Sequence, residues 1–395
     1  MRSVKAHEVL PEVQRLYEQG DYETAEALCA VLEAEERKRK GSLLVRALRA
    51  RGVVNIRRGK PEQALRHYEE ALAISPDDPE VHFSLALYYL SRGDYRRGFA
   101  EYEWRTERPA CIAPGFAERA PLWDGTSIPD RSLMIHCEQG AGDAIQCVRL
   151  LPLLKERVGT LYLACHDALH RLFEKLPAPD RVFNEQMPLP AYDFQLPLLS
   201  IPHRLGLTLA EIPSQVPYLE VPATPPSLTP RRRPRVGLVW RAKPHEGDYR
   251  TAPLAALGAL AAAPVDWVSL QKDPTPEERT LLAGFEAEEA GSGFGDFHDT
   301  AEKIATLDLV ISVDTSVVHL AGALAKPVWV LLPKWAEWRW LIDRADSPWY
   351  PTARLFRQET DHDWAGLART VAARLGAAVQ ASPPNQPWDF LPPLR

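Results

Sequence analysis

The chain has 395 residues, of which 45% are hydrophobic and 25% are charged. This is the composition of a globular protein, and at roughly 150 residues per domain it predicts two to three domains and excludes a mainly disordered chain. The formal net charge is −6. That charge argues against a nucleic-acid-binding protein, which would carry a basic face, so we expect no nucleic-acid partner.

The cellular location is predicted from hydropathy and from the cysteines. No apolar run approaches the ~20 residues that cross a bilayer. The first residues lead into an amphipathic helix without the apolar core of a signal peptide. The cysteines are odd in number and show no C-x-x-C spacing: Cys29, Cys111, Cys137, Cys147 and Cys165. This pattern is typical of reduced thiols, so we expect a cytoplasmic protein without a disulfide framework, a zinc site or a transmembrane segment.

The first hundred residues contain a repeat. The small residues Gly52 and Ala64 are followed 34 positions later by the small residues Ala86 and Gly98. Small residues at fixed positions let paired helices approach closely, and aromatic residues fill the space between the pairs. The pattern resembles the tetratricopeptide repeat family over about residues 6–106, and the alternative is a generic bundle of helical hairpins. Concave repeat surfaces hold peptides or helices, so the array implies a protein or peptide partner.

Prolines and a change in the hydrophobic pattern divide the remaining chain. Short apolar runs alternate with helical patterns, which is typical of a parallel α/β sheet. The predicted strands are 132–137, 160–165, 236–240, 265–270, 309–313 and 327–332, and a last amphipathic helix is predicted over 363–379. The predicted divisions are the repeats (1–108), a linker (109–130), a first α/β domain (131–220), a Pro/Arg-rich hinge (221–234), a second α/β domain (235–380) and a proline-rich tail (381–395).

The strongest local motif follows the predicted strand 309–313. Asp314, Thr315 and Ser316 stand where a helix begins, and His319 lies in its first turn. Free N–H groups, hydroxyl side chains and the helix dipole at such a junction favour an anion at the carboxyl edge of the sheet. The alternative is plain N-capping by Asp314 or Thr315, with His319 as a buried histidine of the core.

A glycine-rich loop follows the predicted strand 132–137. Gln139, Gly140 and Gly142 precede Asp143 at the start of the next helix. Glycines bring the backbone close to a ligand, and a carboxylate there can accept a proton from a hydroxyl group. The alternative role of Asp143 is that of a helix cap.

A basic loop follows the predicted strand 236–240. It carries Arg241, Lys243 and Arg250 before the next helix. Cations at the carboxyl end of a strand suit a diphosphate. The alternative is an ordinary solvated basic loop.

Together these segments resemble the bacterial tetratricopeptide-repeat glycosyltransferases, whose catalytic part is similar to glycosyltransferase family nine, the lipopolysaccharide heptosyltransferases. The resemblance covers about residues 122–375. It is carried by EQGAGDAIQCVRLLPLL, RVGLVW, WVSLQKD, DLVISVDTSVVHLAGALAKPVWVLLP and WRWLIDRADSPWYPTARLFRQ. It implies the GT-B fold, two Rossmann-like domains facing a cleft, here behind an all-α repeat array. It also implies a nucleotide-sugar donor held mainly by the C-terminal domain, inversion of the anomeric centre, and no metal or other cofactor.

The resemblance also implies roles for individual residues. Asp143 matches the general base of the family, and Gln139, Gly140 and Gly142 match its glycine-rich loop. The donor-binding group comprises Lys243, Arg250, Gln271, Asp314, Thr315, Ser316 and His319. The chain departs from its repeat-bearing relatives at residues 240–244, which read W-R-A-K-P instead of W-A-G-N-P, so Lys243 replaces a side-chain amide. Closure of the cleft about the hinge is expected to bring the base to the donor.

Several alternatives accompany this interpretation. Asp361 and Asp363 match the letters of a D-x-D metal motif, but they precede the last helix and are predicted to cap it. The aromatic residues Trp335, Trp338, Trp340, Trp349 and Tyr350 would either stack on a base or sugar or pack a long loop. The leading hypothesis is a glycosyltransferase acting on a protein such as flagellin or on a glycan. The alternatives are a non-catalytic adaptor with a degenerate GT-B scaffold and a GT-B nucleotide-sugar epimerase.

Overall fold

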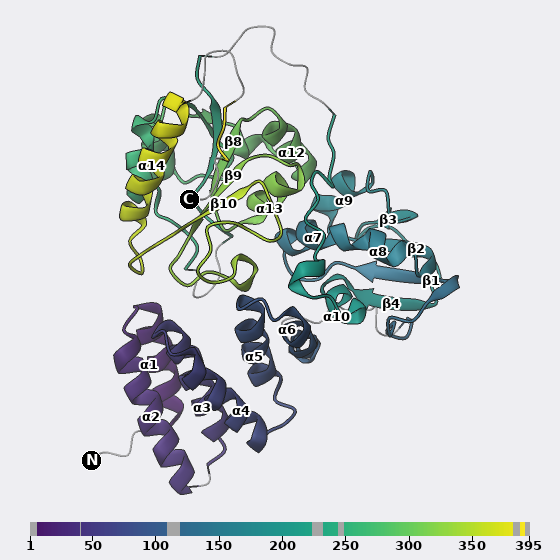
Figure 1. Ribbon diagram of the computed structural model, residues 1–395, viewed down its shortest axis with the longest axis vertical. Helices are drawn as coiled ribbons and strands as arrows, with labels where there is room; N and C mark the ends of the chain where they lie inside the picture. Colours follow the sequence, from purple (N-terminus) through teal and green to yellow (C-terminus); the bar gives the residue numbers. More distant parts are fainter. Residues whose placement is uncertain are drawn as a thin grey trace. The chain divides into compact units, whose positions relative to one another are not determined.

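The computed structural model describes residues 6–39, 41–108, 119–222, 232–243, 249–381 and 388–391. By its contacts the chain divides into two units (Figure 1). The first is Met1–Ile112 together with Glu337–Ile342, and the second is Ala113–Ala336 together with Asp343–Arg395. Parts of the predicted linker, hinge, basic loop and tail lie outside the described residues. Among the helices within those ranges, none combines the length and the apolar character that a membrane span requires.

The first unit consists of helical pairs. Its helices are α1 (Ala6–Glu18), α2 (Tyr22–Arg39), α3 (Leu44–Arg57), α4 (Pro61–Ile74), α5 (Pro79–Ser91) and α6 (Tyr95–Tyr102), followed by the 3₁₀ helix η1 (Glu103–Glu107). A Cβ atom at Gly52 would lie 2.2 Å from the Tyr68 ring, and one at Gly98 would lie 2.6 Å from Leu90. The small positions of the repeat are therefore where helices touch, and the predicted repeat array is confirmed.

The first sheet of the second unit is parallel and short. Its strands are β1 (Ile128–His136), β2 (Val158–Ala164), β3 (Arg181–Phe183) and β4 (Phe194–Pro197), in the order β3-β2-β1-β4. Helices connect them: α7 (Ala141–Cys147), α8 (Leu151–Lys155) and α9 (Asp167–Phe173), with α10 (Ile201–Leu205) after β4. The sequence predicts β1 and β2 and misses β3 and β4, because runs of three or four residues carry too little apolar periodicity to be recognised.

The second sheet is also parallel. Its strands are β5 (Arg235–Val239), β6 (Asp266–Ser269), β7 (Glu288–Glu289), β8 (Leu309–Val313), β9 (Val328–Leu332) and β10 (Ala353–Arg357), in the order β10-β9-β8-β5-β6-β7. The helices are α11 (Pro276–Ala283), α12 (Phe297–Ala305), α13 (Ser316–Ala323) and α14 (Trp364–Ala381). Figure 1 shows α14 on one side of this sheet and α12 and α13 on the other. The predicted fold class, two parallel α/β domains behind a helical repeat array, is confirmed.

The strand orders place a switch point in each sheet. The chain runs from β1 to β2 and β3 on one side and then returns to β4 on the other side of β1. It likewise runs from β5 to β6 and β7 and then returns to β8 beside β5. Loops that leave a sheet in opposite directions open a crevice at the carboxyl ends of the strands, where ligands of α/β proteins bind. The glycine-rich loop follows β1, and the basic loop and residues 314–316 follow β5 and β8.

The carboxylate of Asp193, just before β4, predicts an acid-sensitive contribution to stability. It accepts hydrogen bonds from the Ser132 N–H (2.8 Å) and hydroxyl (2.7 Å) and from Arg131 (2.8 Å). These bonds lower the pKa of Asp193 to about 2, below the ~3.9 of an unfolded aspartate. The contribution is therefore present above pH ~4 and lost as the pH falls through about 2.

We expect the melting temperature of Asp193→Ala to lie below that of the wild type at pH 7, and the gap to close between pH ~4 and ~2. Thermal unfolding at stepped pH measures this. Asp130→Ala, at an exposed position of β1, is the control. A gap that stays constant with pH would contradict the assignment.

Candidate functional site

The start of α13 carries the strongest motif of the sequence. Asp314 is buried directly after β8, and Thr315 is the N-cap residue in an extended conformation (φ −140°, ψ 170°). The Thr315 side chain makes no capping hydrogen bond to the helix, and its hydroxyl lies 3.1 Å from the Ser312 hydroxyl. Capping by Thr315, one of the alternatives above, is therefore not observed. The helix begins at Ser316 with its positive dipole end at the switch point beside β5.

His319 is a buried histidine with a defined partner. It is 4% exposed, and its Nδ1 atom lies 2.9 Å from the Tyr350 hydroxyl. Tyr350 packs on Gly322, where a Cβ atom would lie 2.3 Å from the ring. Lys326 donates hydrogen bonds to the carbonyl oxygens of Ala305 (2.7 Å) and Leu307 (3.0 Å). The histidine, glycine and lysine of the motif thus all have identifiable structural contacts.

The glycine-rich loop turns the chain from β1 into α7. Gln139 adopts a positive φ of 63°, and the N–H of Gly140 donates to Oδ2 of Asp143 at 2.9 Å. Asp143 is half-buried in the first turn of α7. The capping role that competed with the catalytic one is therefore present. It uses one carboxylate oxygen and holds the group in place at the switch point of the first sheet.

Helices α7 and α13 pack together and bring the two motifs into contact. A Cβ atom at Gly142 would lie 2.9 Å from Cδ2 of His319 and 3.4 Å from Cα of Ser316. Only a glycine permits this approach without displacement. The glycine-rich loop of one α/β domain thus lies against the first turn of the helix that follows β8 in the other.

The basic loop is only partly available for an anion. The Arg241 side chain forms an ion pair with Glu278 (3.1 Å) and donates to the carbonyl of Asp273 (3.0 Å). The Arg241 N–H donates to Oε1 of the buried Gln271 at 3.0 Å, so Gln271 supports the loop backbone. Lys243 is exposed and Arg250 is half-buried, while residues 244–248 lie outside the described part of the chain. These residues share the carboxyl edge of β5 and β6, next to β8.

Sequence reasoning missed a buried cation beside this site. Arg149, 5% exposed after α7, donates to the Tyr218 hydroxyl (2.7 Å), the Pro213 carbonyl (3.1 Å) and the Trp349 carbonyl (2.5 Å). Its guanidinium also lies 4.5 Å from the centre of the Tyr350 ring. It therefore joins the first α/β domain to the loop that holds His319. An arginine within a helical pattern gave no signal of these distant partners.

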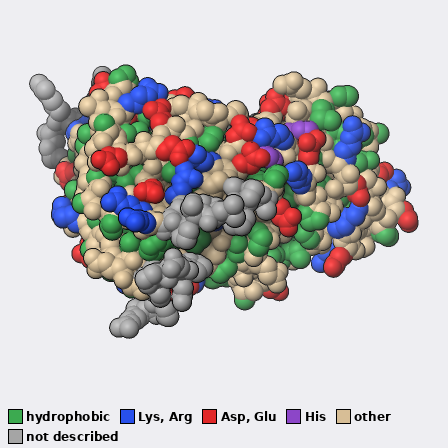
Figure 2. Space-filling view, turned by 90° about the horizontal axis from the view of Figure 1, so that it is seen from above, with side chains coloured by type: hydrophobic (Ala, Val, Ile, Leu, Met, Phe, Trp, Pro, Cys, Tyr) green, Lys and Arg blue, Asp and Glu red, His purple; other side chains and the backbone are tan. Residues whose placement is uncertain are grey.

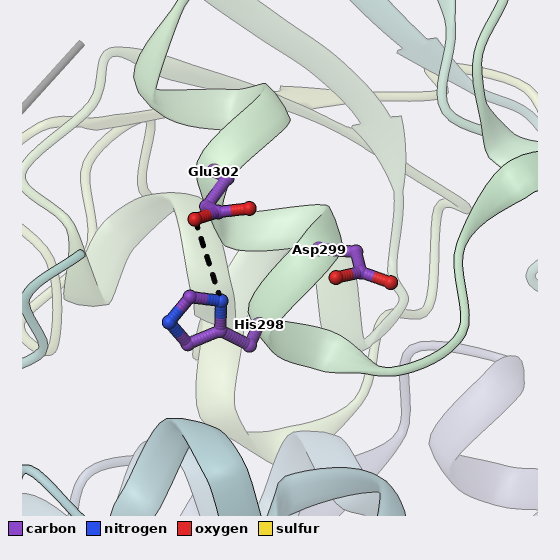
Figure 3. A group of neighbouring side chains, drawn as sticks. All are labelled: His298, Asp299 and Glu302. Carbon is purple, nitrogen blue, oxygen red and sulfur yellow. Dashed lines mark ion pairs between the residues drawn. The ribbon is translucent and has the colours of Figure 1, made fainter. Parts of the chain in front are cut away.

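Two groups of potential metal ligands have other roles. His298, Asp299 and Glu302 lie close together on α12 (Figure 3), but Arg171 is 2.8 Å from Nδ1 of His298 and 2.6 Å from Asp299. A guanidinium thus already occupies this cluster. Figure 2 shows acidic and basic side chains interspersed over the visible face, with histidine side chains among them. Asp363 accepts a hydrogen bond from the Gly366 N–H (2.7 Å) at the start of α14, which is the predicted cap.

Comparison with known proteins agrees with parts of this description. Residues 54–93 match the family model of the TPR repeat. The curated protein FlbA of Caulobacter vibrioides is 27% identical over 361 residues, which are 80% of this chain and 59% of FlbA. The chain therefore spans about three-fifths of the length of this relative.

Solved structures similar to the chain include glycosyltransferases. One is the ADP-heptose LPS heptosyltransferase II of E. coli, with 13% identity and a TM-score of 0.44, covering 63% of this chain and 100% of that one. Another is a mutant O-GlcNAc transferase of Thermobaculum terrenum, with 15% identity and a TM-score of 0.28, covering 96% of this chain and 93% of that one.

Proposed function

We propose that this chain is a glycosyltransferase that moves a sugar from a nucleotide-sugar to an acceptor hydroxyl, with inversion at the anomeric carbon and without a metal ion. One observation carries the proposal: Gly142 packs on Ser316 and His319. This contact brings Asp143 and an anion-favouring helix terminus together at the switch points of two parallel sheets. Inverting transfer requires such a pair, a proton acceptor on one side and stabilisation of the leaving diphosphate on the other.

The donor would be held at the carboxyl edge of the second sheet. The N–H groups in the first turn of α13 and the dipole of the helix favour a diphosphate beside Thr315 and Ser316. Lys243 and Arg250 follow β5, the strand paired with β8, and their charges suit the same anion. Gln271 would keep the loop of these cations in place through its bond to the Arg241 N–H.

The acceptor would be a protein or peptide, such as flagellin, or a glycan. The support is the repeat array, since the concave surface of such arrays binds peptides and helices. Asp143 would accept the proton of the acceptor hydroxyl, which is a poor nucleophile until that proton leaves.

A thermal-shift panel of UDP, GDP, ADP, CMP and TDP, each with and without its sugars, tests the proposed function. A ligand of the folded state raises the melting temperature by mass action, by ~2.7 kcal/mol of added stability at 100 times its Kd. We expect one nucleotide to stand out. An adaptor would bind none of them, and an epimerase would convert the sugar nucleotide without any acceptor.

Donor binding is expected to persist in EDTA. The α13 terminus and the two cations supply the positive charge, so titration calorimetry of the preferred nucleotide should give the same Kd in EDTA and in Mg²⁺. Thr315→Val, which removes the hydroxyl and keeps the shape, is expected to weaken binding in both buffers. A strict requirement for Mg²⁺ or Mn²⁺ would contradict the metal-independent proposal.

Removal of residues 1–106 is expected to abolish transfer to a macromolecular acceptor and to leave slow donor hydrolysis. The deletion also removes the ring partners of Trp338 (Tyr95, Phe99 and Tyr102). Full-length Trp338→Ser is therefore the control that separates loss of the array from loss of this packing. Transfer at the full rate by the shortened chain would show that the array is not the acceptor site.

A further inference from the structure

The loop between β9 and β10, residues 333–352, belongs to both units. The chain passes from the second unit into the first at Glu337 and returns to the second at Asp343. Each half of the loop carries aromatic residues that are fully or almost fully buried: Trp338 and Trp340 in the first half, Trp349 and Tyr350 in the second. The burial of these four residues agrees with packing of the loop, one of the two predicted alternatives.

The first half of the loop completes the repeat array. The Trp338 ring lies edge-on to Tyr95 (5.9 Å between centroids) and Phe99 (5.7 Å), which belong to the last repeat helix, α6. Arg339 covers Trp338 at 4.4 Å, and Glu337 accepts a hydrogen bond from the Arg339 N–H. A repeat array requires a cap, because its terminal repeat otherwise exposes an apolar face. Residues 337–342 supply part of that cap.

The second half of the loop holds the candidate site. The Tyr350 hydroxyl contacts Nδ1 of His319, and the Trp349 carbonyl accepts a hydrogen bond from Arg149. Arg149 also donates to the Tyr218 hydroxyl, which in turn donates to the Ile145 carbonyl in α7. The orientation of His319 therefore depends on a residue of this loop.

The chain between these two ends is held by several contacts. Arg344 and Asp346 form a two-pronged ion pair with distances of 2.7 Å. The Ala345 carbonyl accepts from the Leu355 N–H in β10 at 2.9 Å, and Leu341 has a left-handed φ of 50°. A left-handed non-glycine residue persists only where its surroundings enforce it. Residues 343–348 join the two halves of the loop, so a displacement of residues 337–342 has to be accommodated in the segment that leads to Tyr350.

We propose that the β9–β10 loop couples the last repeat to His319: Trp338 is its anchor in the array, and Tyr350 is the positioning residue for the histidine. The functional meaning rests on the proposed function and on the prediction from the family resemblance that His319 belongs to the donor-binding group. Occupancy of the array by an acceptor would then change donor binding through this loop, and the linkage is reciprocal.

Histidine NMR tests the coupling without any nucleotide. The full-length chain is labelled with ¹³Cε1-histidine, and the His319 signal is assigned by its loss in His319→Gln. We expect Tyr350→Phe to shift this signal, because the bond to Nδ1 is removed, and Trp338→Ala to shift it as well. The His136 signal, from β1, is the internal reference that should not move in Trp338→Ala.

The matched control is Tyr68→Ala, a buried ring of α4 in the same array that is not among the ring partners of Trp338. If Tyr68→Ala shifts His319 as much as Trp338→Ala does, the effect is general loosening of the array and the proposal fails. It also fails if Tyr350→Phe moves the signal and Trp338→Ala does not. Trp338→Phe, a smaller change, replaces Trp338→Ala should the latter not fold.

The proposed function can fail separately. If no nucleotide of the panel binds, the glycosyltransferase proposal is contradicted. The histidine signals still decide whether the loop couples the last repeat to His319. If a nucleotide binds, calorimetry adds a second measure. Trp338→Ala should then weaken its affinity more than Tyr68→Ala does, and equal affinities would contradict the coupling.

Discussion

Asp143→Asn is expected to lower turnover by at least ~10²-fold and to leave the melting temperature and nucleotide affinity unchanged. A positioned carboxylate contributes ~10²–10⁴-fold as a general base, and the lower figure corresponds to ~2.7 kcal/mol in the barrier. Asparagine is as good a helix cap as aspartate, so it can still accept the hydrogen bond from the Gly140 N–H. The substitution therefore removes the proton acceptor and keeps this hydrogen bond. Turnover with the preferred donor and acceptor, together with thermal unfolding, measures the two effects.

Asp143→Ala separates the two roles of this carboxylate. It removes both the cap and the base, and loss of a cap costs about 1 kcal/mol, so this variant should melt earlier and should be as inactive as Asp143→Asn. Near wild-type turnover of Asp143→Asn would place the base elsewhere. Unfolding of Asp143→Asn would assign the residue to structure alone.

Gly142→Ala is expected to weaken nucleotide binding and turnover by about 10- to 100-fold. The new Cβ atom would lie 2.9 Å from Cδ2 of His319, closer than nonbonded carbon atoms approach, so the His319 ring or the two helices α7 and α13 must shift. Overpacking of this kind costs typically 1–3 kcal/mol. Calorimetry with the preferred nucleotide and steady-state turnover give the two magnitudes.

Gly258→Ala is the matched control for Gly142→Ala. It makes the same chemical change in the second α/β domain, where no atom lies within 4 Å of the new Cβ. We expect it to leave binding and turnover unchanged and to add slightly to stability, since it restricts the unfolded chain. If Gly142→Ala behaves like Gly258→Ala, close packing of α7 on α13 is not required for function.

The sequence by itself determined the features that have a local period. The 34-residue spacing of small residues places Gly52 and Gly98 at helix contacts, and uninterrupted apolar runs identify strands such as β8 and β9. The junction at residues 314–316 was recognisable because a buried strand followed by Asp, Thr and Ser is a local pattern. The two-residue β7 and the partly charged β10 lack such a pattern, and only pairing with β6 and β9 makes them strands.

The partners of the charged and aromatic residues were decided by tertiary structure alone. Arg241 belongs to a basic loop in sequence, but Glu278, far along the chain, neutralises it. Arg149 contacts Tyr218, which is 69 positions away in the chain. Trp338 contacts Tyr95, which is more than 200 positions away. Sequence periodicity reports which face of an element is buried, not what covers it. The sequence therefore identified Gly142, Ser316 and His319 separately. Only the packing of α7 on α13 shows that they touch one another.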